Sequence, residues 1–166
     1  KANAMAYLDD CIGRFTDRLR QSPQWDNTLV IFLPDHGIPY PEGLTETDER
    51  KSHIPMIWTG GAVREPRRVE VLCNQTDLPA TLLGQLGLPH DDFRFSRDVL
   101  SRNYTHPSAL HAWSEGIYYK DKTGITVLNL LTQPVGTFRE APQPSQRRTN
   151  AAKAFLQTAY DALGAL

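Results

Sequence analysis

The 166-residue sequence has few cysteines, no long apolar run and almost no net charge. Its two cysteines, Cys11 and Cys73, stand far apart, so they form neither a CxxC zinc motif nor a dense disulfide framework. Two buried free thiols are the simpler expectation, and a single disulfide bridge is the open alternative. No apolar run exceeds five residues, which is too short to cross a bilayer as a helix. The net charge of -1 excludes the basic footprint of a nucleic-acid-binding domain and a polybasic membrane patch.

Common catalytic and nucleotide-binding motifs are missing as well. The sequence contains no Walker A loop, no GxGxxG and no GxSxG. Residues 1–5 lack the apolar region of a signal peptide. The chain opens directly into a helical pattern without a start signal, and we therefore expect further sequence to precede it. The length is that of one domain, and 40% hydrophobic residues are typical of a globular protein.

Apolar periodicity predicts three helices in this chain. Apolar residues recur at three- and four-residue steps over residues 2–20. A short helix is predicted before Gly87, because Thr76 or Asp77 can cap its start, Pro79 suits its first turn and glycine suits the position after its end. Ser145 is expected to cap a last helix whose inward face is Ala152, Phe155, Leu156, Ala159 and Leu163.

Strand signals are concentrated in two regions. Residues 29–33 form an unbroken apolar run, which predicts a strand buried on both faces, as in parallel sheets. A second strand is predicted at residues 53–58, where Pro55 favours an edge or a bulge. Residues 88–111 are polar and are predicted to be irregular. Residues 113–120 and 125–130 flank a Gly-containing turn at 121–124, which predicts a hairpin.

The first predicted strand stops at Pro34, and Asp35 and His36 follow at its carboxyl end, where ligands bind in open α/β sheets. A carboxylate oxygen and an imidazole nitrogen together suit Zn or Mn, so the pair predicts half of a metal site. The alternative is a polar turn in which Asp35 caps backbone amides and His36 is simply exposed. The polar loop 38–52 returns at His53, which places both loop ends on one rim.

Other charged and histidine residues are interpreted as ordinary. The acidic residues of the loop are expected to form a solvated face and not outer metal ligands; they are Glu42, Glu46, Asp48 and Glu49. Three further histidines match no metal-binding spacing and are interpreted as surface or core residues; they are His90, His106 and His111.

The order of these features resembles the C-terminal part of a sulfatase-type enzyme of the alkaline phosphatase superfamily. Within that group the chain is most similar to the lipoteichoic acid synthase, or phosphoglycerol transferase, branch. The resemblance covers about residues 2 to 90. It rests on the sequences at residues 4–13, 26–37, 53–56 and 76–83.

The resemblance implies an α/β fold: the C-terminal portion of an alkaline-phosphatase-like sandwich, with a mixed, mostly parallel sheet and flanking helices. A small antiparallel hairpin and a C-terminal helix would be added to it. The whole chain, 1–166, would be the C-terminal portion of a sulfatase-like catalytic domain. Residues 1–90 would form the core α/β part with the metal half-site, and residues 91–166 a C-terminal subdomain.

The resemblance also implies roles for three residues. Asp35 and His36 would bind the catalytic divalent metal, Mn or Zn, and His53 would contact the phosphate or sulfate group of the substrate. The hydroxyl nucleophile and another acidic ligand of such enzymes lie in an N-terminal half whose motifs are absent here. The chain is therefore expected to be a fragment that is inactive by itself.

The expected function is that of a metal-dependent phosphotransferase or sulfatase, working through a covalent intermediate on the missing nucleophile. Its expected partners are the N-terminal half of the same enzyme and a small-molecule, lipid or glycan phosphate or sulfate ester. No nucleic acid is expected, and a membrane is expected only through an upstream anchor. The resemblance implies an extracytoplasmic location.

Two other hypotheses compete with this one. In the first hypothesis, the chain is a non-catalytic α/β binding domain whose partner surface is the loop 38–52. Asp35, His36 and His53 are then ordinary rim residues. In the second it is a self-contained small hydrolase that uses Ser52 beside His53, although no nucleophile motif supports that.

Overall fold

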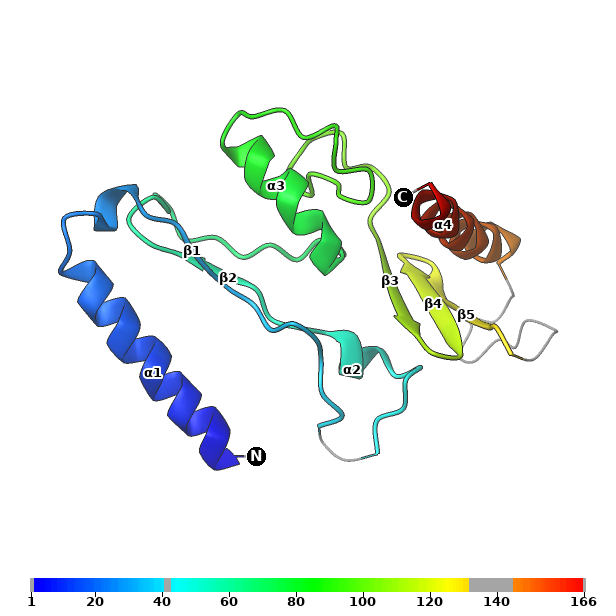
Figure 1. Cartoon of the computed structure of the whole chain (residues 1–166), viewed down its shortest axis with the longest axis horizontal. Coiled ribbons are helices and arrows are strands. Elements are labelled where there is room, and N and C mark those ends of the chain that lie inside the picture. Colours follow the sequence, from blue (N-terminus) through cyan, green and yellow to red (C-terminus); the bar gives the residue numbers. More distant parts are fainter. Residues whose placement is uncertain (1, 41–42, 132–144, 166) are drawn as a thin grey trace. The chain divides into compact units, whose positions relative to one another are not determined.

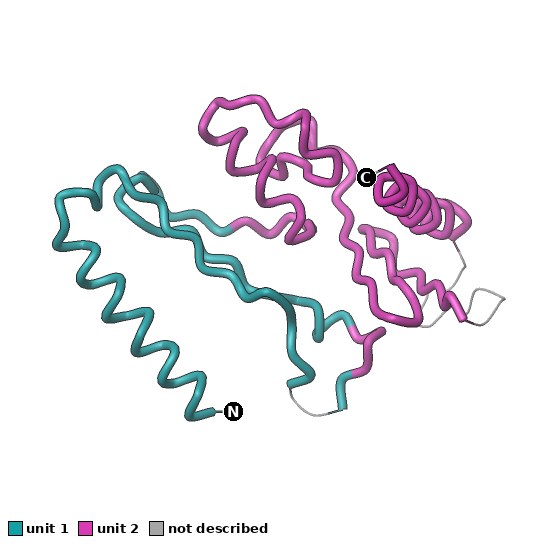
Figure 2. Tube along the Cα trace, in the orientation of Figure 1, with its two compact units in different colours: residues 1–44, 49–68 teal, residues 45–48, 69–166 magenta. Residues whose placement is uncertain are grey.

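A computed structural model of the chain describes residues 2–40, 43–131 and 145–165 (Figure 1). The chain forms two compact units (Figure 2). Unit 1 comprises residues 1–44 and 49–68, and unit 2 comprises residues 45–48 and 69–166. Within the described ranges, no helix combines the length and the apolar character needed to cross a membrane.

Unit 1 begins with the long helix α1, Ala2–Arg20, which confirms the helix predicted for these residues. No residue of α1 is buried, and Met5, Leu8 and Phe15 are each at least half exposed. Phe15 contacts Phe32 edge to face, with 6.5 Å between the ring centroids. The predicted apolar stripe therefore exists, but most of it stays uncovered within the described chain.

Two short strands follow in unit 1. A short 3-10 turn, Trp25–Asn27, precedes strand β1, Val30–Phe32. Strand β1 pairs antiparallel with β2, Ile57–Thr59 (Figure 1). The β1 residues are half-buried instead of buried on both faces, because among the described residues the one sheet neighbour of β1 is the antiparallel β2. Strand β2 begins later than predicted, since Pro55 has no N–H to donate to a ladder. The connecting loop contains one short helix, α2, Glu49–Ser52.

Unit 2 contains a three-stranded antiparallel sheet in the order β3-β4-β5. Its strands are β3, Ser108–Trp113, β4, Gly116–Asp121, and β5, Gly124–Asn129. The predicted hairpin is confirmed, with Asp121 opposite Gly124 at the turn. Strand β3 was missed, because its sequence lacks a clean apolar alternation and its pairing with β4 depends on the tertiary structure.

Helix α4, Gln146–Gly164, packs on one face of this sheet (Figure 1). Ser145 caps it as predicted, since the Ser145 Oγ atom accepts the Arg148 backbone N–H at 3.3 Å. The core between helix and sheet is formed by Ile117, Leu128 and Ala152, with Phe155 and Leu156 packed against it. Leu163 is 66% exposed, so the predicted inward face ends earlier. A helix of this length, about 28 Å, is longer than strands of six residues, about 20 Å.

The third part of unit 2 is α3, Leu78–Gln85, preceded by a 3-10 turn, Gln75–Asp77. Gly87 has φ 67° just after the helix, as the sequence predicted. Asp77 stands at the N-cap position of α3 but makes no side-chain cap there; its carboxylate instead closes a capping box with Asn74 around the 3-10 turn. Both cysteines are free; Cys11 is half-buried and Cys73 is exposed, although burial was expected for both.

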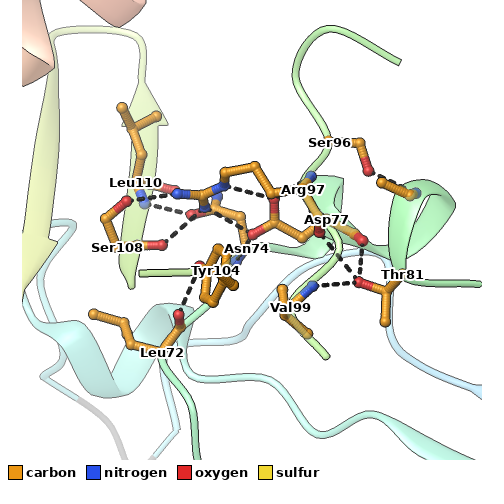
Figure 3. A network of polar contacts seen from close by, with 11 residues as sticks. Leu72, Asn74, Asp77, Thr81, Ser96, Arg97, Val99, Tyr104, Ser108 and Leu110 are labelled. Atoms are coloured by element: carbon orange, nitrogen blue, oxygen red, sulfur yellow. Dashed lines mark hydrogen bonds and ion pairs between the residues drawn. The ribbon is translucent and has the colours of Figure 1, made fainter. Parts of the chain in front are cut away.

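A polar network fixes the start of α3 within unit 2 (Figure 3). Its centre is the buried Asp77 carboxylate, to which the Arg97 guanidinium donates from Nε and Nη2. The same guanidinium donates to Ser108 Oγ at 2.7 Å and to the Ser108 carbonyl at 3.0 Å. Asn74 exchanges two hydrogen bonds with the Leu110 backbone. The network therefore joins α3, the segment before β3 and β3 itself.

Candidate metal half-site at the end of β1

The Asp35–His36 turn lies three residues beyond the end of β1 and is exposed to solvent. The side chain of Asp35 is 87% exposed and that of His36 is 71% exposed. The His36 backbone N–H donates to Asp35 Oδ1 at 3.0 Å, which is the polar-turn contact of the alternative interpretation. A carboxylate oxygen and an imidazole are nonetheless both accessible to a ligand.

One contact of His36 decides which ring nitrogen is available. Its Nδ1 atom lies 2.8 Å from the carbonyl oxygen of Gly37. A carbonyl oxygen can only accept, so Nδ1 carries the proton in this contact and the neutral ring keeps its lone pair on Nε2. This backbone carbonyl orients the imidazole in the way that metal-bound histidines are commonly oriented. The Nε2 atom itself lies 3.6 Å from Asp35 Oδ2, on the same side as the carboxylate.

His53 belongs to the same end of unit 1. The backbone of Gly37 lies so close to Lys51 and Ser52 that a Cβ atom at Gly37 would collide with the Lys51 carbonyl oxygen. Ser52 immediately precedes His53, whose side chain is exposed. The two ends of the loop 38–52 therefore meet, and the three residues singled out from the sequence lie at one end of the β1–β2 ribbon.

These residues fit part of a metal site. Among residues 2–40, 43–131 and 145–165, no three His, Cys, Asp or Glu side chains gather into a group that could hold a metal ion. Catalytic zinc sites use three protein ligands and an open position. The Asp35 oxygen and the His36 nitrogen have suitable chemistry for Mn or Zn, but they supply two ligands.

Ser52 does not form a nucleophile–base pair in this structure. Its Oγ atom is buried and has no hydrogen-bond partner in the described part of the chain. An activated serine needs a base within hydrogen-bond reach and access to substrate. The geometry therefore gives no support to a self-contained hydrolase that uses Ser52 and His53.

A second polar cluster escaped the sequence analysis. In unit 2, Glu46 Oε2 lies 3.4 Å from His111 Nε2, so Glu46 is not merely part of a solvated face. The His111 ring stacks on Trp113, with 6.0 Å between centroids, and is 5.4 Å from the Tyr118 ring. The available signal was the i, i+2 spacing of His111 and Trp113, which share a face once the segment is a strand. Glu42, another acidic residue of the loop, lies outside the described residues.

Comparisons with known proteins point to one family. A sequence profile of the family described as Sulfatase matches residues 1–88. The chain is 28% identical to the inner membrane protein YejM of Salmonella typhimurium over 107 residues, which are 60% of this chain and 18% of YejM. It is also 53% identical to the multifunctional alkaline phosphatase superfamily protein PehA of Trinickia caryophylli over 30 residues. These residues are 18% of this chain and 6% of PehA.

A solved structure shows the same fold. A protein of the alkaline phosphatase superfamily from Vibrio parahaemolyticus matches 96% of this chain with a TM-score of 0.75 and 23% sequence identity. This match confirms the expected alkaline-phosphatase-like α/β architecture. The chain covers 41% of that protein, so it spans less than half the length of each of these relatives.

Proposed function

This chain belongs to the sulfatase family, and from that premise we propose that it contributes metal ligands to an enzyme acting on phosphate or sulfate esters. The observation that carries the proposal is the juxtaposition of exposed Asp35 and His36 with His53 at one end of the β1–β2 ribbon. A hard oxygen and an oriented imidazole nitrogen suit a divalent cation, and a neighbouring imidazole suits an anionic substrate.

In this proposal the Asp35 carboxylate and His36 Nε2 hold Mn or Zn. The metal, when bound, lowers the pKa of a hydroxyl nucleophile and offsets the negative charge of the ester. Because two protein ligands are too few for a catalytic site, the remaining ligands and the nucleophile come from residues outside this chain. The short coverage of the relatives, 41% for the solved structure, agrees with such a division.

The chemistry is a displacement in two steps. The nucleophile's oxygen bonds to phosphorus or sulfur, the ester oxygen leaves as an alcohol with a proton, and a covalent intermediate forms on the protein. Water or an acceptor hydroxyl then displaces the nucleophile. His53 donates a hydrogen bond to a non-bridging oxygen, where negative charge develops. The Asp-His-Gly turn favours a phosphotransferase of the phosphoglycerol transferase type over a sulfatase.

The exposed apolar surface of unit 1 suggests that another protein segment covers this unit. Met5, Leu8 and Phe15 of α1 are each at least half exposed, and β1 is half-buried. We propose that the rest of the same catalytic domain covers this surface. We also propose that the substrate is a lipid, glycan or small-molecule ester on the extracytoplasmic side; a membrane setting for the whole enzyme is supported by the description of YejM as an inner membrane protein.

Calorimetric titration with Mn²⁺ and with Zn²⁺ tests the half-site. We expect weak binding by this chain, and at least about tenfold weaker binding (about 1.4 kcal/mol) by Asp35→Asn, since this variant loses a charged oxygen ligand. Asp92→Asn is the matched control, because Asp92 is exposed and belongs to the other unit. In an enzyme containing the whole domain, Asp35→Asn should abolish turnover, and near-normal turnover would refute the assignment.

The competing function, a non-catalytic binding domain, makes the opposite forecast. If Asp35, His36 and His53 are ordinary rim residues, wild type and Asp35→Asn bind Mn²⁺ and Zn²⁺ equally poorly. The exposure of both side chains is the observation in its favour. The same titration therefore separates the two functions.

A further inference from the structure

Unit 2 contains a cavity of about 340 Å³ that has no part in the proposed metal site. It lies between α4, the strands β3 and β4, and the segment that carries Arg94 and Arg97. Its size falls at the lower end of the range for small-molecule sites, roughly 300–1,000 Å³. A ligand that fits it is therefore small.

The cavity exists because α4 presents short side chains to it. Ala151, Ala154 and Thr158 follow one another at three- and four-residue steps and line the same side of the cavity. Larger apolar side chains also line it: Phe155 from α4 itself, Leu110 from β3 and Phe95 from the segment before β3. The walls can therefore hold an apolar body.

The two arginines of the cavity differ in their partners. Arg97 is committed, because its guanidinium donates to both Asp77 oxygens and to Ser108 (Figure 3). Arg94 is exposed, and its guanidinium has neither a hydrogen bond nor an ion pair with any described residue. No acidic residue is among the described residues lining the cavity, so the charge of Arg94 is uncompensated there.

A second donor lines the same cavity. Tyr119 lines the cavity from β4, and its hydroxyl has no hydrogen-bond partner among the residues that the structure describes. An available guanidinium and an available phenol at the edge of an apolar pocket form a site for an oxyanion, which a guanidinium binds through two parallel hydrogen bonds.

We propose that this cavity binds a small amphipathic oxyanion, namely an alkyl or aryl group that carries one carboxylate or one phosphate. The apolar body packs against Phe95, Leu110 and Phe155, and the head accepts hydrogen bonds from Arg94 and Tyr119. Arg97 also lines the cavity but donates to protein acceptors. The site needs no metal, so its test is independent of the proposed catalytic function.

Three probes of equal chain length test the proposal by calorimetry on the full chain: hexanoate, hexyl phosphate and 1-hexanol. We expect saturable one-to-one binding of at least one anion, at least about tenfold tighter than binding of the alcohol, because charge-assisted hydrogen bonds to a guanidinium are roughly twice as strong as neutral ones. Whichever anion binds more tightly identifies the head as a carboxylate or a phosphate.

Variants locate the binding. Arg94→Gln should weaken anion binding at least tenfold, whereas the matched control Arg102→Gln should not change it, since Arg102 is exposed and does not line the cavity. Ala154→Leu should weaken binding of every probe by filling the space, while its far-ultraviolet circular dichroism stays that of wild type. The proposal fails if neither anion saturates, if 1-hexanol binds as tightly as both anions, or if Arg94→Gln binds like wild type.

Discussion

The Arg97 guanidinium meets both carboxylate oxygens of Asp77, with Nε 2.9 Å from Oδ1 and Nη2 2.7 Å from Oδ2. Asp77 is 1% exposed and also accepts the backbone N–H groups of Asn74 and Arg97. Burial disfavours a charged Arg97, but the hydrogen bond and the negative charge of Asp77 outweigh it and raise the Arg97 pKa above its usual value. The contact joins residues that are twenty positions apart in the sequence.

Replacing Asp77 with asparagine should destabilise unit 2 strongly. The change leaves the Arg97 guanidinium without its counter-charge. Removing one partner of a buried ion pair lowers the free energy of unfolding by roughly 3–5 kcal/mol, and the partial exposure of Arg97 favours the lower end, about 3 kcal/mol. Urea unfolding of wild type, Asp77→Asn and the exposed control Asp91→Asn measures this. An Asp77→Asn midpoint equal to that of Asp91→Asn would contradict the role of the pair.

Asp121 should make the stability of unit 2 depend on pH. Burial of Asp121 raises its pKa, but hydrogen bonds from Thr123 and the charges of Arg147 and Arg148 outweigh burial, so the Asp121 pKa is lowered overall. A lowered pKa means that the carboxylate stabilises the fold above its unfolded-state pKa, about 3.9. That stabilisation is lost as the pH falls through the folded-state pKa.

The comparison of wild type with Asp121→Asn measures this contribution. We expect Asp121→Asn to be less stable by about 1 kcal/mol at neutral pH, and the difference to shrink below about pH 4. Urea midpoints across this pH range give the result. A difference that stays constant, or grows on acidification, would mean that the Asp121 charge does not act in this way.

Two glycines of unit 1 should respond in opposite directions to alanine. Gly60 has φ 113°, and a Cβ atom there would collide with the Thr28 carbonyl oxygen, so Gly60→Ala should cost roughly 1–3 kcal/mol. Gly13 lies inside α1 with open space around it, so Gly13→Ala should raise stability by about 0.5–1 kcal/mol. The melting temperatures of the two variants, measured by thermal unfolding, test this difference. Equal melting temperatures would contradict the close approach of Gly60 to the Thr28 carbonyl oxygen.

His53 should affect catalysis without affecting metal binding, if the proposed function is right. In an enzyme containing the whole domain, His53→Ala should lower kcat/KM by about 10²-fold, the usual cost of losing a donor to a developing charge. Metal affinity, measured by titration, should stay that of wild type. His106→Ala is the control, because His106 is exposed and belongs to unit 2. A loss of metal affinity in His53→Ala would instead make His53 a ligand.

Local signals in the sequence predicted several elements well. The periodicity of α1, the Ser145 cap of α4, the glycine after α3 and the hairpin turn at Asp121 all depend on residues within a few positions of one another. The rim formed by His36 and His53 was also anticipated, because both flank the same loop. Strand β3 was not, since six residues without clear alternation become a strand only through pairing with β4.

The sequence by itself determined where most helices and turns lie, and it placed an acid and an imidazole after the first strand. Only the tertiary structure decided the antiparallel pairing of β1 with β2, the pairing of Asp77 with Arg97, and the contact of Glu46 with His111. The physical reason is how far apart along the sequence the interacting residues lie. Capping and periodicity act within one or two turns of chain, whereas a buried ion pair or a strand register depends on which distant segment fills the opposite side.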